Sequence, residues 1–170
     1  MAKISLNLRN CFIQLTPYHM AAIVKVSAKT QNRTALGIVH AYCAINPNCS
    51  FKQLQKAFPS SLCPDSGVKQ LILPIKEALE FNTKMSLYFT KDGEPIILAD
   101  GTTVALAQIW SGDSLQRIMQ HAVSLGIDAS MPDKNGQYGI AGFALTFFEI
   151  PKFTAAIKCS FWQSLLNLFK

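Results

Sequence analysis

The chain has 170 residues, of which 49% are hydrophobic and 15% charged, and its formal net charge is +6. This length fits one domain, or one domain with an appendage, and the high apolar content excludes an intrinsically disordered chain. The positive charge is concentrated at one end, because residues 1–63 contain seven Lys and Arg residues but no Asp or Glu. A positive block of this kind attracts polyanions such as nucleic acid, although solubility and protein contacts also produce basic surfaces.

The first quarter of the chain gives the weakest structural signals. Within Ser5–Ile13, Leu6 and Leu8 alternate with polar residues, and this loose period of two predicts a strand. The segment that follows, residues 17–24, begins with a proline and fits either a short helix or a strand.

Three helices are predicted next. The first spans Thr34–Ile45 and the second Phe51–Phe58, where Ser50-Phe51-Lys52-Gln53 is a capping box that fixes the start of the helix. The third spans Val68–Phe81 and is expected to bend at Pro74, because proline removes an amide hydrogen and clashes with the preceding turn.

The hydrophobic period then changes from helical to alternating. The pattern predicts three strands, over Met85–Thr90, Ile96–Ala99 and Thr103–Gln108. The dipeptides Asp92-Gly93 and Asp100-Gly101 separate them. Asp-Gly between short β-rich runs is a strong hairpin signal, because such turns need positive φ. The sequence therefore predicts a three-stranded antiparallel meander.

A fourth helix and a strand complete the central part of the chain. Ser111 or Asp113 caps the helix, which runs to Leu125 with an apolar stripe on one face. The glycine-rich segment Met131–Gly142 is predicted to be a loop, and Phe143–Ile150 a strand.

Five short motifs stand out within these elements. They are Ser50-Phe51-x-x-Leu54-x-x-x-Phe58-Pro59, Tyr88-Phe89, Leu98-x-Asp100-Gly101-x-x-Val104, Gln108-x-Trp110 and Leu115-x-x-Ile118-x-x-x-Ala122-x-x-Leu125-Gly126. Together they resemble a small winged-helix-like module of bacterial restriction and phage-defence proteins, where it occurs alone or fused to endonuclease or ATPase domains. The resemblance covers roughly residues 34–127, and the chain departs from it at Ser111, which intervenes where a glycine usually follows the tryptophan.

The expected fold class is α+β, with a winged helix-turn-helix-like helical centre followed by the antiparallel meander and further helices. Residues 1–33 are expected to form a basic segment packed on the core, residues 34–127 the winged-helix-like domain, and residues 128–170 a C-terminal extension with an apolar helix. A likeness at the level of the fold does not determine a function.

No signature of an enzyme is present in the sequence. No Asp or Glu is followed by Lys two residues later, as a common nuclease motif requires, and no glycine-rich phosphate loop occurs. His40, Cys43 and Cys49 resemble half of a zinc site, but a fourth ligand at suitable spacing is missing. We therefore expect a non-enzymatic protein with no catalytic residue, cofactor or metal, and a nuclease stays open as the enzymatic alternative.

The cysteines and the apolar segments bear on location. The chain has five cysteines, an odd number, with no C-x-x-C pair, which is typical of a reducing compartment. No signal peptide is expected. Charged residues and a proline interrupt the apolar stretch 140–169, so no membrane partner is expected either. A cytoplasmic protein of a bacterium or phage is the expectation.

The basic residues are the best candidates for a function. In a winged helix such positions commonly contact phosphates, although lysines also simply solvate helix faces. The sequence does not distinguish DNA from RNA, and Trp110 is expected to pack in the core rather than to stack on bases. The candidate nucleic-acid-binding residues are Lys25, Lys29, Arg33, Lys52, Lys56, Lys69 and Lys91.

The C-terminal segment suggests a second class of function. A helix is predicted over Phe153–Phe169, and its large apolar side chains must be buried in the core, in a homodimer or other protein interface, or at a membrane surface. The alternative function is therefore a protein–protein interaction or inhibitor module. The candidate partner-binding residues are Phe161, Trp162, Leu165 and Phe169.

Overall fold

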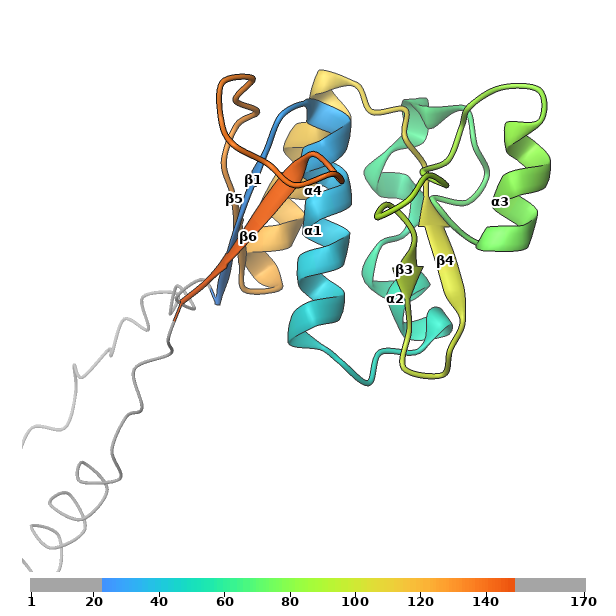
Figure 1. Cartoon of the computed structure of the whole chain (residues 1–170), viewed down its shortest axis with the longest axis horizontal. Helices are drawn as coiled ribbons and strands as arrows, with labels where there is room; N and C mark the ends of the chain where they lie inside the picture. The colour runs from blue at the N-terminus through green and yellow to red at the C-terminus, as the bar shows by residue number, and fades with distance from the viewer. Residues whose placement is uncertain (1–22, 149–170) are drawn as a thin grey trace, which may run out of the picture.

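The computed structural model of the chain describes residues 23–148 (Figure 1). It mixes helices with short strands, which confirms the predicted α+β composition. The predicted strand Ser5–Ile13 and the predicted helix Phe153–Phe169 lie outside the described residues. The elements are β1 (Val24–Ala28), α1 (Gln31–Ile45), α2 (Phe51–Ala57), β2 (Ile72–Pro74), α3 (Ile75–Asn82), β3 (Ile96–Ile97), β4 (Thr103–Leu106), α4 (Gly112–Ser124), β5 (Ile127–Ala129) and β6 (Phe143–Phe147), with two 3₁₀ turns at Ser60–Leu62 and Pro64–Ser66.

The first sheet, sheet A, has the strand order β5-β1-β6. β1 is parallel to β5 and antiparallel to β6. Val24, Val26 and Ala28 alternate along β1 and are fully buried, and α1 and α4 cover this face side by side (Figure 1). The sheet combines β1, which lies within the predicted N-terminal segment, with β6, which lies within the predicted C-terminal extension, so the core includes a part of each flanking segment.

The close packing of α1 on β1 depends on Gly37. A Cβ atom placed on this glycine would lie 2.6 Å from Cγ1 of Val26 and 3.2 Å from Cγ of Phe143. The distance of 2.6 Å to Val26 is shorter than two carbon atoms in van der Waals contact allow. The helix can therefore approach the sheet only where the side chain is missing.

We predict that Gly37→Ala destabilises the protein by about 1–3 kcal/mol, because the added methyl group overpacks the interface of α1 with β1. Alanine favours a helix over glycine by about 1 kcal/mol, so propensity alone predicts the opposite sign. The control is Gly112→Ala at the start of α4, where an added Cβ atom meets nothing within 4 Å. Urea unfolding of both variants checks this, and a more stable Gly37→Ala protein would contradict it.

The predicted third helix over Val68–Phe81 is confirmed only in its second half. Residues 68–71 belong to no helix or strand, Ile72–Pro74 form β2, which pairs with β4, and α3 begins only after Pro74. Leu71, Ile72 and Leu73 are all buried, and three consecutive residues cannot share one face of a helix. Proline also disfavours helical backbone in the residue before it, so Pro74 joins a strand to a helix and does not bend one.

The second sheet, sheet B, has the order β2-β4-β3 and differs from the predicted meander. The hairpin of β3 and β4 is confirmed, with Gly101 at φ 81° in its turn. The third strand, however, is β2, and Met85–Thr90 joins β4 only through the bridge of Tyr88 with Ala107. The reason is Asn82, whose side-chain oxygen accepts the amides of Leu87 and Tyr88 at 2.8 and 2.9 Å and so replaces a strand partner.

Two predicted helix starts are confirmed. Ser50 and Gln53 form both hydrogen bonds of the capping box at the start of α2. At α4 the cap is Ser111, whose hydroxyl accepts the amide of Ser114 at 3.2 Å, and Asp113 lies inside the helix. The short strand β5 that follows α4 was not expected from the sequence.

Candidate phosphate-binding site

The structure distributes the seven predicted basic residues over several surfaces. Lys25 lies on the outer face of sheet A, directly opposite Asp128 in the parallel neighbour β5. Lys69 precedes β2 and lines a hollow of about 420 Å³ together with Glu77. Each of these two lysines therefore has an acidic residue of a neighbouring element nearby.

Lys52 and Lys56 lie at a different end of the molecule from Lys29. Both are exposed on α2, which follows the C-terminal end of α1, whereas Lys29 precedes the N-terminal end of α1. The 15 residues of α1 extend over about 22 Å. A single small ligand therefore cannot contact both groups.

Lys29 lies at a hollow of about 740 Å³ between the N-terminus of α1, the segment before α4 and the loop after β5. A second hollow of about 320 Å³ adjoins it and shares Lys29, Thr30 and Lys134. Both lysines are exposed, and neither forms an ion pair with another residue between positions 23 and 148. The larger hollow is lined by Lys29, Thr30, Gln31, Asn32, Gln108, Ile109, Trp110, Pro132 and Lys134.

The position of this hollow follows from the topology of sheet A. β1 and β5 are parallel, so their carboxyl ends lie at the same edge, and the hollow opens beside the residues that follow both strands. In sheets with parallel strands, ligands bind in the crevice outside the carboxyl ends, where a helix N-terminus often points.

The backbone at the start of α1 is arranged to accept negative charge. Thr30 is the N-cap, but its side chain makes no capping bond, and its hydroxyl donates to Oδ1 of Asn32. The first turn contains no acidic residue. The first amides of a helix lack intrahelical acceptors and carry the positive end of the helix dipole, so an anion is favoured there.

Arg33 has a structural role beside this site. Its guanidinium forms an ion pair with Glu94 at 2.6 Å, donates to the carbonyl of Ala141 at 3.1 Å and lies 4.8 Å from the ring centre of Phe89. The Glu94 side chain is only 6% exposed. The charge of Arg33 is therefore compensated inside the protein, and the residue forms the wall of the smaller hollow.

The predicted meander puts Lys91 at the tip of the hairpin between Met85–Thr90 and Ile96–Ala99, and this position is wrong, because Lys91 lies in the loop between α3 and β3. Its backbone amide donates to Oε2 of Glu94 at 2.9 Å, next to the ion pair of Glu94 with Arg33. Lys91 is exposed and belongs to the same end of the molecule as Lys29.

The loop that carries Lys134 is anchored to sheet A. The amide of Asp133 donates to the carbonyl of Ala28 at 3.0 Å, and the hydroxyl of Tyr138 donates to the carbonyl of Asp133 at 2.9 Å. The carboxylate of Asp133 accepts the amide of Asn135 at 2.9 Å. Lys134 was missed because its place beside Lys29 follows from the pairing of β5 with β1, which no local signal indicated.

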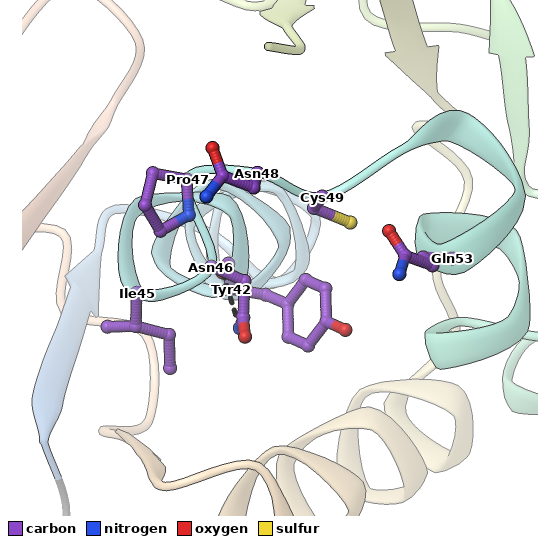
Figure 2. Close-up of a pocket in the computed structure, with 7 residues that line it drawn as sticks. All are labelled: Tyr42, Ile45, Asn46, Pro47, Asn48, Cys49 and Gln53. Atoms are coloured by element: carbon purple, nitrogen blue, oxygen red, sulfur yellow. Dashed lines mark hydrogen bonds between the residues drawn. The ribbon is translucent and has the colours of Figure 1, made fainter.

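A further hollow of about 350 Å³ lies at the other end of α1 (Figure 2). Its lining is neutral, with the ring of Tyr42 and the thiol of Cys49 facing the amide of Gln53 across it. Burial raises the pKa of Cys43 nearby to about 12 and also raises the pKa of Cys49. The thiolate is the reactive form of cysteine, so neither thiol is activated as a nucleophile.

His40 of α1 also has its hydrogen-bond partner inside the fold. Nε2 of His40 lies 3.0 Å from the carbonyl oxygen of Glu94, and the ring packs against Phe143 at 4.9 Å. Burial lowers its pKa below the ordinary value. Within residues 23–148, no group of three or more His, Cys, Asp or Glu side chains is placed to hold a metal ion.

The predicted partner-binding residues Phe161, Trp162, Leu165 and Phe169 lie outside the described residues. No helix between residues 23 and 148 has the length and apolar character needed to cross a membrane. Comparison of the chain with protein-family models, curated proteins and solved structures finds no match.

Proposed function

We propose that the protein is a non-enzymatic nucleic-acid-binding module that holds backbone phosphates at the hollow beside the N-terminus of α1. The observation that carries the proposal is the convergence of Lys29 and Lys134 with the uncapped amides of α1 at the carboxyl ends of two parallel strands. Lysine ammonium groups and free helix amides are the groups with which proteins commonly bind phosphate.

The same site favours binding that is independent of base sequence. Trp110 lines the hollow but is only 7% exposed, and its indole N–H donates to the carbonyl of Ala107 at 2.8 Å. Its ring therefore packs in the core, and the charged donors exposed in the hollow are the ammonium groups of Lys29 and Lys134, which suit phosphates. Contacts to phosphate position a protein on nucleic acid without reading its sequence.

The winged-helix-like interpretation of residues 34–127 is part of this proposal. It is supported by the strand order of sheet B, in which the last strand β4 lies between β2 and the hairpin strand β3, and by the helices that precede it. The tip of that hairpin carries Asp100 and no lysine, so we do not assign phosphate contacts to it. The resemblance described above adds a setting in bacterial or phage defence.

We predict that the protein binds a fluorescent 20-mer of DNA or RNA at 50 mM salt and that Lys29→Ala/Lys134→Ala weakens this binding. If each lysine neutralises one phosphate of duplex DNA, the double variant lowers the slope of log K against log salt by about 2. Fluorescence anisotropy over a salt series, with single- and double-stranded probes, measures both quantities.

The matched control is Lys52→Ala/Lys56→Ala, which removes the same charge from α2 at the other end of α1. Its binding should fall less than that of the Lys29→Ala/Lys134→Ala protein, while both variants keep the melting temperature of the unmodified protein, since all four lysines are exposed. Equal binding by the Lys29→Ala/Lys134→Ala variant and the unmodified protein, or no binding of any probe at 50 mM salt, rejects the proposal.

A further inference from the structure

Sheet A ends at β6, whose outer edge is paired by no strand among residues 23–148. The amide of Lys29 donates to the carbonyl of Gly142 at 3.0 Å, which fixes the phase of the ladder between β1 and β6. Hydrogen-bonded pairs alternate along an antiparallel ladder, so every second residue after Gly142 faces β1. The residues between them, Phe143, Leu145 and Phe147, therefore point their amide and carbonyl groups outward from the sheet.

The other three edges of the two sheets carry protection that β6 lacks. β5 has only three residues, and one of them is Asp128. β2 contains Pro74, and β3 has only two residues, which follow Pro95. Short strands, charges and prolines keep an edge from pairing with another chain. β6, by contrast, is five residues long, and residues 139–148 contain neither a charged residue nor a proline.

The side chains of β6 indicate what an added strand must offer. Phe143, Leu145 and Phe147 pair with residues of β1 that are fully buried, so they lie on the helix-covered face of the sheet. Phe147 is nevertheless 55% exposed. A strand added to this edge must therefore bring a large apolar side chain to that face and need not bring a charge.

We propose that the edge of β6 pairs with the same edge of a second copy of the chain, in an antiparallel dimer with two-fold symmetry. In such a dimer each copy offers the groups that it receives. With Leu145 on the two-fold axis, Phe147 lies opposite Phe143 of the second copy. The outward amides and carbonyls of all three residues then find partners, and the two copies of sheet A become one continuous sheet.

The second copy supplies what the edge requires. On the helix-covered face the ring of Phe147 meets the ring of Phe143 of the second copy, and aromatic pairs across strands stabilise a sheet. On the opposite face Ala144 lies beside Thr146 of the second copy, so small neutral side chains meet there. The chain carries a net charge of +6, but the paired segments are uncharged and therefore oppose no like charges.

The first test is amide hydrogen exchange of the full chain, read by NMR at single residues over a dilution series. The amides of Ala144 and Thr146 are bonded to β1 within one copy and should exchange slowly at every concentration. The amides of Leu145 and Phe147 should be protected only in the dimer and should exchange at least about tenfold faster after dilution. Sedimentation velocity on the same samples should show the mass fall from twice 18.7 kDa to 18.7 kDa.

The second test removes one outward amide. Phe147→Pro deletes an amide that points away from β1, and proline is tolerated at such a position of an edge strand. The variant should keep the circular dichroism spectrum of the unmodified protein and stay monomeric where that protein is dimeric. The matched control is Ile97→Pro on β3. Ile97 is 75% exposed, and its amide also points outward, because the neighbouring amide of Leu98 donates to Thr102.

Three outcomes overturn the proposal. Fast exchange of Leu145 and Phe147 at every concentration does so, and a doubled mass in that case means that the copies join elsewhere. Protection of the two amides that persists in the monomer assigns the edge to another segment of the same chain. Equal association by the Phe147→Pro and Ile97→Pro proteins excludes the edge of β6 as the interface. The dilution series decides by itself if a proline variant fails to fold.

Discussion

Arg33→Leu is expected to lower the free energy of unfolding by about 3 kcal/mol, because the substitution leaves Glu94 buried without its partner. Breaking a buried ion pair from one side costs about 3–5 kcal/mol, and Arg33 remains 25% exposed, which places the effect near the lower end. The loss of the hydrogen bond to Ala141 and of the contact with the ring of Phe89 acts in the same direction. Urea unfolding at neutral pH measures the change.

The companion variant Arg33→Leu/Glu94→Gln separates charge from packing. Glutamine keeps an oxygen that can accept the amide of Lys91 but carries no charge, so the double variant should recover at least about half of the lost stability. Lys56→Leu on the exposed face of α2 is the surface control and should change stability by less than about 0.5 kcal/mol. A double variant less stable than Arg33→Leu would show that the buried charge is not the cause.

Phe58→Ala is expected to cost about 3–5 kcal/mol, since the truncation removes a fully buried ring and leaves a cavity between α1, α2 and α4. The ring of Phe58 contacts Tyr42 edge-on at 5.3 Å between centres and His121 at 5.9 Å. It is 2% exposed, whereas the ring of Phe81 on α3 is 54% exposed. Phe81→Ala therefore serves as the control for loss of the same side chain.

Thermal and urea unfolding of both phenylalanine variants test this contrast. The control should lose less than about 1 kcal/mol, because its ring already meets solvent. Comparable losses of stability from the two substitutions would mean that the ring of Phe81 is covered, for example by a molecule bound in the hollow of about 420 Å³ that Phe81 lines.

Elements fixed by signals between near neighbours could be predicted from the sequence. The capping box of Ser50 and Gln53, the cap at Ser111 and the turn at Gly101 each depend on residues within a few positions, and each is confirmed. The segment Val68–Phe81 was predicted to be one helix because its apolar residues match a helical period. A short apolar run such as Leu71–Leu73 fits a buried strand equally well, and periodicity alone does not distinguish the two.

Sheet A and the candidate site depend on pairings that no local pattern contains. β5 has only three residues, and its place beside β1 is set by burial of Ile127 and by the packing of α4 on α1. Lys29 could be named from its position before a helix, but Lys134 reaches the same hollow only through this long-range pairing. Arg33 was assigned to a ligand because sequence cannot reveal that Glu94 faces it.

The central position of β1 in sheet A has a consequence for biosynthesis. Its partners β5 and β6 are translated about a hundred residues later, so closing the sheet requires contacts of high sequence separation, which form slowly. Sheet B and the helices around it, whose pairings lie closer in sequence, can form while the ribosome is still adding α4. Until then both edges of β1 lack their partner strands, and this apolar segment of the nascent chain is open to association with other chains.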